Sequence, residues 1–110
     1  MSIMERSAKI FVARKAAREL KKEIEQAGVD NLKYLAEKNI SIVGTYINGC
    51  SLEKKAEIKR NLVYVLSMGI TIDMVLEQLG QLMPELAPVM TGREVYRKSE
   101  VKEIERFLGG

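Results

Sequence analysis

Two carboxylates, Asp73 and Glu77, lie four positions apart in a segment with helical apolar spacing. Side chains four apart share one face of a helix, so this pair could bind a hard cation or divide the roles of general acid and general base. A hard cation such as Ca²⁺ takes six or more oxygen ligands, and nothing else nearby completes such a shell. We therefore expect a solvated helix face at this position and no metal site.

The sequence has few other residues or motifs that could carry out catalysis. The 110 residues contain no histidine, which removes His-based acid–base catalysis, Ser-His and Cys-His dyads and imidazole metal ligands. Cys50 is the single cysteine, and a thiol with no histidine to activate it is a poor nucleophile. Gly44 and Gly49 lack the spacing and the following lysine of a phosphate-binding loop. The sequence therefore predicts a protein that is not an enzyme and needs no cofactor.

The clearest candidate binding surface is on residues 3–27. At 100° per residue, five cations of this segment fall within one helical arc of about 120°. They are Arg14, Lys15, Arg18, Lys21 and Lys22. Met4 and Phe11 fall in the same arc, which makes them candidate contacts to a protein partner. This face can bind DNA phosphates, or it can be a solvated basic face whose apolar residues are covered by the fold.

The elements that must position these residues are helices. Apolar residues recur at three- and four-residue steps, which predicts an all-α fold, a small bundle of four to five helices in one domain over residues 1–110. Ser2 and Glu5 form a capping box at the start of the first helix, predicted over residues 3–27. Gly28 supplies its stop, because glycine readily takes the left-handed conformation that ends helices.

Two more helices are predicted over residues 52–68 and 72–83, begun by the N-caps Ser51 and Thr71. Gly69 separates them and permits a tight turn. If the two helices turn their apolar sides together across this turn, one set of side chains is buried between them. The predicted set is Leu66, Val75 and Leu79.

The segment between Gly28 and Gly49 is less regular. Asp30 is a good N-cap, and apolar spacing predicts one helix running from it toward Gly49. Residues 40–48 are β-branched and contain a glycine, however, so a short strand or a break near Asn39 is the alternative.

The pair of helices over residues 52–83 could also form a helix-turn-helix-like hairpin, since such units place two helices around a short turn that often contains Gly. The second helix would then read DNA. It exposes Asp73 and Glu77, however, and carboxylates that face a polyanion are unfavourable. A plain helical hairpin in the core is the simpler interpretation.

Residues 92–108, GREVYRKSEVKEIERFL, resemble the last part of excisionase-type and MerR-type winged helix-turn-helix domains. The matching residues are Gly92, Arg93, Tyr96, Arg97, Ser99, Glu100 and Val101. In that family a short wing strand carries an arginine and a tyrosine at the DNA backbone, so the resemblance implies this role for Arg93, Tyr96 and Arg97. The alternative is an amphipathic helix that closes the bundle, either continuous or recapped at Ser99, in which Glu100 and Glu103 form ordinary surface pairs.

Composition narrows the class of protein. The net charge of +3 and pI near 9.0 are mildly basic, and no apolar run approaches the twenty or so residues that span a bilayer. We expect a cytoplasmic protein that does not contact a membrane.

Two functions fit the sequence. The first is a small DNA-associated regulatory or accessory protein, acting in transcription regulation, that contacts phosphates through its basic helix. The alternative is a helical adaptor or inhibitor that docks on another protein. A homodimer suits either function, because a long first helix with two apolar surfaces is hard to cover in so small a domain.

Overall fold

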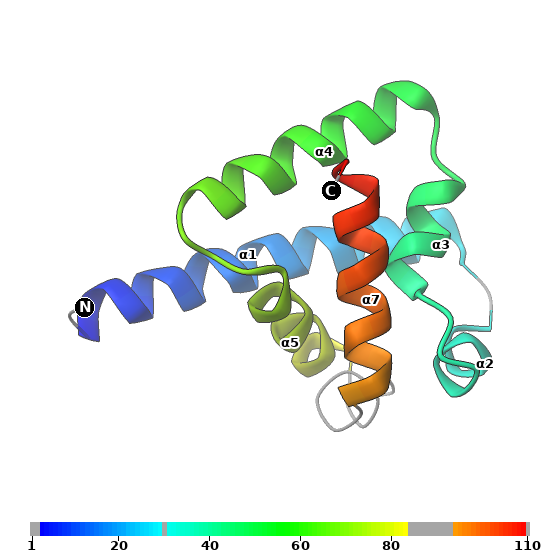
Figure 1. Ribbon diagram of the computed structural model, residues 1–110, viewed down its shortest axis with the longest axis horizontal. Coiled ribbons are helices and arrows are strands. Elements are labelled where there is room, and N and C mark those ends of the chain that lie inside the picture. The colour runs from blue at the N-terminus through cyan, green and yellow to red at the C-terminus, as the bar shows by residue number, and fades with distance from the viewer. Residues whose placement is uncertain (1–2, 30, 84–93, 110) are drawn as a thin grey trace.

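The computed structural model describes residues 3–29, 31–83 and 94–109, and all of the regular structure in these ranges is helical. The described helices are α1 (Ile3–Ala27), α2 (Leu32–Glu37), α3 (Ile42–Asn48), α4 (Leu52–Ser67), α5 (Ile72–Leu82) and α7 (Glu94–Phe107). Figure 1 shows α1 running through the length of the molecule, with the other helices arranged around it. The predicted all-α bundle is confirmed, with six described helices where four to five were predicted.

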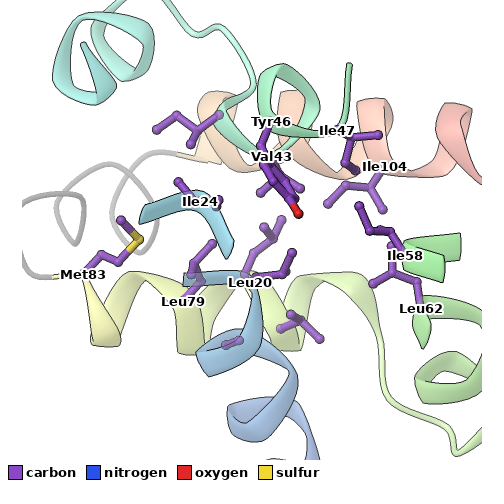
Figure 2. Close-up of a cluster of buried hydrophobic side chains, with 14 of the residues drawn as sticks. Leu20, Ile24, Val43, Tyr46, Ile47, Ile58, Leu62, Leu79, Met83 and Ile104 are labelled. Atoms are coloured by element: carbon purple, nitrogen blue, oxygen red, sulfur yellow. The ribbon is translucent and has the colours of Figure 1, made fainter. Parts of the chain in front are cut away.

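The long helix α1 packs most closely against α5. Its buried face has two alanines at its centre, Ala13 and Ala17, which are almost completely buried. Their short side chains let the α5 backbone approach. Leu20 and Ile24 continue the same face and meet side chains from α3, α4, α5 and α7 in one core, as Figure 2 shows.

The predicted caps of α4 and α5 form where the sequence places them, whereas the predicted capping box of α1, Ser2 with Glu5, lies outside the part of the chain whose side chains are described. Ser51 Oγ accepts a hydrogen bond from the Lys54 N–H at 3.1 Å, and Thr71 Oγ1 accepts one from the Met74 N–H at 3.1 Å. Each bond satisfies a backbone donor that the first turn leaves free. Gly28, with φ of 67°, lies in the left-handed region directly after α1, as predicted for its stop.

The segment 31–48 is not one helix, so that prediction is wrong. It forms the short helices α2 and α3, separated at Asn39, which has a left-handed φ of 58°. Asparagine tolerates this conformation better than most residues, and the Ile40 N–H closes the turn on the Leu35 carbonyl at 2.8 Å. The break near Asn39 is therefore the correct alternative, and the segment after it is helical from Ile42. Asp30, the predicted N-cap, lies outside the described residues.

The turn at Gly69, where φ is 83°, joins α4 to α5 at a bend of 110°. This angle is one that helix-turn-helix units also use, but here α5 lays its apolar side on α1 and α7. The expected burial is only partly correct. Val75 and Leu79 are buried, at 3% and 0% exposure, whereas Leu66 is only half-buried, because α4 turns away from α5.

Residues 94–107 form one continuous helix, α7, with no second start at Ser99. A wing strand through Tyr96 and Arg97, which the winged-helix resemblance implied, is therefore wrong. The four-residue steps from Tyr96 to Glu100 and Ile104 place these residues on one buried helical face. The sequence also has the spacing of a capping box before this helix, Thr91 with Glu94, but these two residues fall outside the part of the chain whose side chains the structure describes.

Truncation of Leu76 tests this packing. Leu76 is fully buried on α5, so Leu76→Ala should lower the free energy of unfolding by about 2–5 kcal/mol through lost transfer energy and a residual cavity. The matched control is Leu52→Ala, because Leu52 is 84% exposed and its truncation should change stability by less than about 0.5 kcal/mol. Urea unfolding followed by circular dichroism measures both. Equal losses for the two variants would contradict the arrangement of α5.

Candidate functional site

A concavity with a volume of about 450 Å³ lies between α1 and α4. The two helices run in opposite directions along it (Figure 1). Its floor is aliphatic and comes from both helices. The floor residues are Val12, Ala16 and Leu20 of α1 with Ile58, Leu62 and Val65 of α4. We call this concavity the α1–α4 groove.

Three large apolar side chains at one end of the α1–α4 groove remain open to solvent. Phe11 and Tyr64 are each 67% exposed, and Met68 is 42% exposed. Single exposed apolar residues are normal on a protein surface, but a contiguous group that lines one groove is a feature of interaction sites. We call Phe11, Tyr64 and Met68 the apolar mouth.

The opposite end of the groove is closed by polar contacts. Lys54 Nζ of α4 lies 2.9 Å from Glu23 Oε1 of α1, and the Tyr46 hydroxyl donates to Glu23 Oε2 at 2.8 Å. The hydrogen bond to Glu23 raises the pKa of Lys54. Burial and the same carboxylate raise the pKa of Tyr46, so its hydroxyl stays protonated and continues to donate. The Lys54–Glu23 contact joins α4 to α1 at this end of the groove, and Tyr46 of α3 binds the same carboxylate.

The structure divides the predicted basic arc of α1. Arg14 is half-buried and turns toward α5, where its Nη1 donates to Gln78 Oε1 at 3.0 Å and to Gln81 Oε1 at 3.4 Å. Lys21 is also half-buried. The remaining cations, Lys15, Arg18 and Lys22, are exposed. Of the two apolar candidates, Phe11 joins the apolar mouth, and the side chain of Met4 lies outside the described part.

The other candidate DNA contacts are engaged within the fold or are not described. Tyr96 has no exposed surface, so the structure removes it from any surface that DNA could reach. The Arg97 guanidinium makes two hydrogen bonds to the Asp73 carboxylate, one of them from Nε to Oδ1 at 3.1 Å. That contact ties α7 to α5. Arg93 lies outside the described residues.

Sequence reasoning missed a buried polar cluster formed by Ser41, Tyr96 and Glu100. The Glu100 carboxylate accepts hydrogen bonds from two hydroxyl groups, that of Ser41 and that of Tyr96, the latter at 2.5 Å. It also accepts hydrogen bonds from the backbone N–H groups of Ile42 at 2.9 Å and Val43 at 3.3 Å. Glu100 therefore caps the start of α3 and is not the surface residue that we expected. A signal was present in the sequence, because Glu100 lies midway between Tyr96 and Ile104 on the apolar face of its helix.

The chemistry of this cluster is that of a buried helix cap. Burial raises the pKa of Glu100, while the hydrogen bonds from Ser41, Tyr96 and the backbone act to lower it. A perturbed carboxyl group is often a sign of an active site, but neither the α1–α4 groove nor the small cavity beneath α4 is lined by Glu100. Among the described residues, no group of three or more potential ligands could hold a metal ion.

Comparison with known proteins identified no relative of this chain. No protein-family model, no curated protein and no solved structure gave a significant match to the chain. Within the described residues, no single helix has the length and hydropathy to cross a membrane; α4 and α5 reach that length and hydropathy only when taken together across their 110° bend. The assignment of function therefore depends on the geometry of the site.

The buried carboxyl group predicts a specific pH dependence. Because the pKa of Glu100 is raised above its ordinary value of 4.5, the folded state holds this proton more tightly than the unfolded chain does. The contribution of Glu100 to the free energy of unfolding is then greatest below pH 4.5 and is lost as the pH rises through the raised folded pKa. Glu100→Gln should remove this contribution.

Urea unfolding at a series of pH values from 4 to 8 measures the effect as the difference between wild type and variant. The control is Glu105→Gln, a substitution of an exposed glutamate on the same helix, whose stability profile should run parallel to that of the wild type. A parallel profile for Glu100→Gln would show that Glu100 has no raised pKa in the folded protein.

Proposed function

We propose that this protein is a non-enzymatic docking module that binds an amphipathic helix of another protein in the α1–α4 groove. The observation that carries the proposal is the convergence of Phe11, Tyr64 and Met68 on one apolar concavity. Aromatic side chains contribute much of the energy at protein interfaces, because they bury a large area and lose little conformational entropy. An apolar groove between helices is also a common receptor for a helical ligand.

The shape of the groove supports a helical partner over a small molecule. Small-molecule sites enclose most of the ligand surface, whereas Phe11 and Tyr64 remain two-thirds exposed around this groove. A third helix laid along α1 and α4 would insert side chains at steps of three and four residues into the aliphatic floor. It would cover the apolar mouth that the described fold leaves open.

A second candidate function is association with DNA. Lys15, Arg18 and Lys22 remain exposed on successive turns of α1 and could neutralise backbone phosphates. The structure weakens this candidate relative to the sequence, because Arg14 and Arg97 already have partners and Tyr96 is buried. The expectations of a role in transcription regulation, a cytoplasmic location and a homodimer stay predictions.

The docking function can be tested with a neutral helical peptide that carries leucines at steps of three and four residues and Gln and Ala elsewhere. Titration of the full chain, followed by two-dimensional amide NMR, should shift resonances of α1 and α4. Phe11→Ala and Tyr64→Ala should each weaken binding by about tenfold, or ~1.4 kcal/mol, as expected for aromatic interface residues. Tyr34→Ala is the control, because Tyr34 is exposed on α2. Shifts confined to other helices would refute the groove as the site.

The DNA candidate makes a separate prediction. If three cations each neutralise one phosphate, the logarithm of the binding constant should fall with the logarithm of salt concentration at a slope of about −3. Arg18→Glu with Lys22→Glu should abolish binding to duplexes of any sequence, since phosphate contacts carry no base information. Fluorescence anisotropy of a labelled duplex measures both, with Lys33→Glu on α2 as control. Absence of binding by the wild type at low salt would exclude this function.

A further inference from the structure

We propose that the helix received by the α1–α4 groove is acidic along its flanks and is bound there by Lys15 of α1 and Arg60 of α4. This inference rests on the docking function and specifies the chemistry of the partner. It starts from a pattern shared by both helices. Phe11 and Lys15 lie four residues apart on α1, and Arg60 and Tyr64 lie four residues apart on α4. Residues at this spacing are neighbours on one helix face.

Each of the two helices that border the groove, α1 on one rim and α4 on the other, therefore carries one aromatic side chain with one cation a turn away. Phe11, Lys15 and Tyr64 line the groove. Arg60 is not among the lining residues, but it lies one helical turn from Tyr64 on α4. A helix laid between the rims would therefore place its apolar residues against the floor. The residues on its two flanks would lie beside Lys15 and Arg60.

Both cations are available to a partner. Lys15 and Arg60 are exposed, and neither makes an ion pair within the described ranges. Of the carboxylates near the groove, Glu23 and Glu57 are already paired with Lys54 at its closed end. Only Glu19 among the lining carboxylates is without such a pair.

A third cation adds to the positive charge at the open end. Lys9 lies against the turn after Met68, where its Nζ is 3.2 Å from the position that a Cβ on Gly69 would take. Three cations thus lie on the two helices that border the groove, Lys9, Lys15 and Arg60, whereas Glu19 is the one lining carboxylate without an ion pair among the described residues. Charge complementarity favours an acidic ligand over a neutral or basic one.

The same charges disfavour a second copy of this chain as the occupant. A two-fold dimer brings the same surface patch of both copies together. Lys15 and Arg60 would then face like charges in a chain whose net charge is already +3.

Single-stranded nucleic acid is also acidic and stacks on aromatic side chains. The groove floor between Phe11 and Tyr64 is aliphatic, however, with Val12, Leu62 and Val65. Base edges pressed against such a floor would lose hydrogen bonds to water without replacement, which is unfavourable. Leucine and similar side chains of a helix have no such groups, so the floor favours a peptide.

The test uses three synthetic helical peptides with identical apolar residues and with Glu, Gln or Lys at the flanking positions. Isothermal titration of the full chain at low salt should show the Glu peptide binding about tenfold more tightly than the Gln peptide, and the Lys peptide more weakly than both. This preference should shrink at high salt, because exposed charges are screened.

Variants assign the preference to the two rim cations. Lys15→Gln with Arg60→Gln should abolish the preference, so that this variant binds the Glu peptide and the Gln peptide with equal affinity. Lys33→Gln with Lys102→Gln makes the same change in net charge at exposed sites on α2 and α7 and should preserve the preference. Lys15→Glu with Arg60→Glu should reverse it toward the Lys peptide.

The outcomes separate this inference from the docking function. Equal affinities for the three peptides would overturn the acidic partner and leave the docking function intact. A complete lack of peptide binding would overturn both. Displacement of the Glu peptide by an oligothymidylate at equal or lower concentration would replace the peptide partner with single-stranded nucleic acid.

Discussion

The packing of α5 on α1 is the most extensive contact between two described helices, and α4 and α7 are both joined to this pair. Because Ala13 and Ala17 are so small, α5 can lie close along one side of α1. The other side of α5 then takes α7, held by the Arg97–Asp73 contact, and α7 in turn carries Glu100 to the start of α3. The bend of 110° at Gly69 directs α4 away from α5. Helix α4 therefore meets α1 along an incomplete contact, and the α1–α4 groove is the result.

Local signals in the sequence were sufficient for the long helices. The caps Ser51 and Thr71 and the stop at Gly28 act within one turn of their own residues, so their effect can be read without knowledge of the fold. The break at Asn39 is different. Asparagine is tolerated both within a helix and in a left-handed turn, and α3, which follows the turn, packs against α7, a contact that the local sequence does not reveal.

The candidate site was harder to predict, because it depends on which arc of each helix a neighbour covers. A helical wheel grouped Arg14 with Lys15 and Arg18, but α5 covers one edge of that arc and binds Arg14 through Gln78. Phe11 was identified as a partner contact from its place on the wheel. Tyr64 and Arg60 were not, since their importance appears only when α4 is placed beside α1. Glu100 likewise depends on Ser41, 59 positions earlier in the chain.

The carboxylate cap on α3 has a consequence for the order of folding. An isolated helix of seven residues is far too short to persist in water, and the acceptor for its first N–H groups is supplied by α7, which leaves the ribosome more than fifty residues later. During synthesis, α1, α4 and α5 can associate while α3 still lacks its cap. The contacts of Glu100 then close a long loop late in the reaction, as expected for non-local pairings. Folding of the domain would therefore be completed only after α7 has left the ribosome. Until then the partly assembled helices would expose apolar surface to which chaperones can bind.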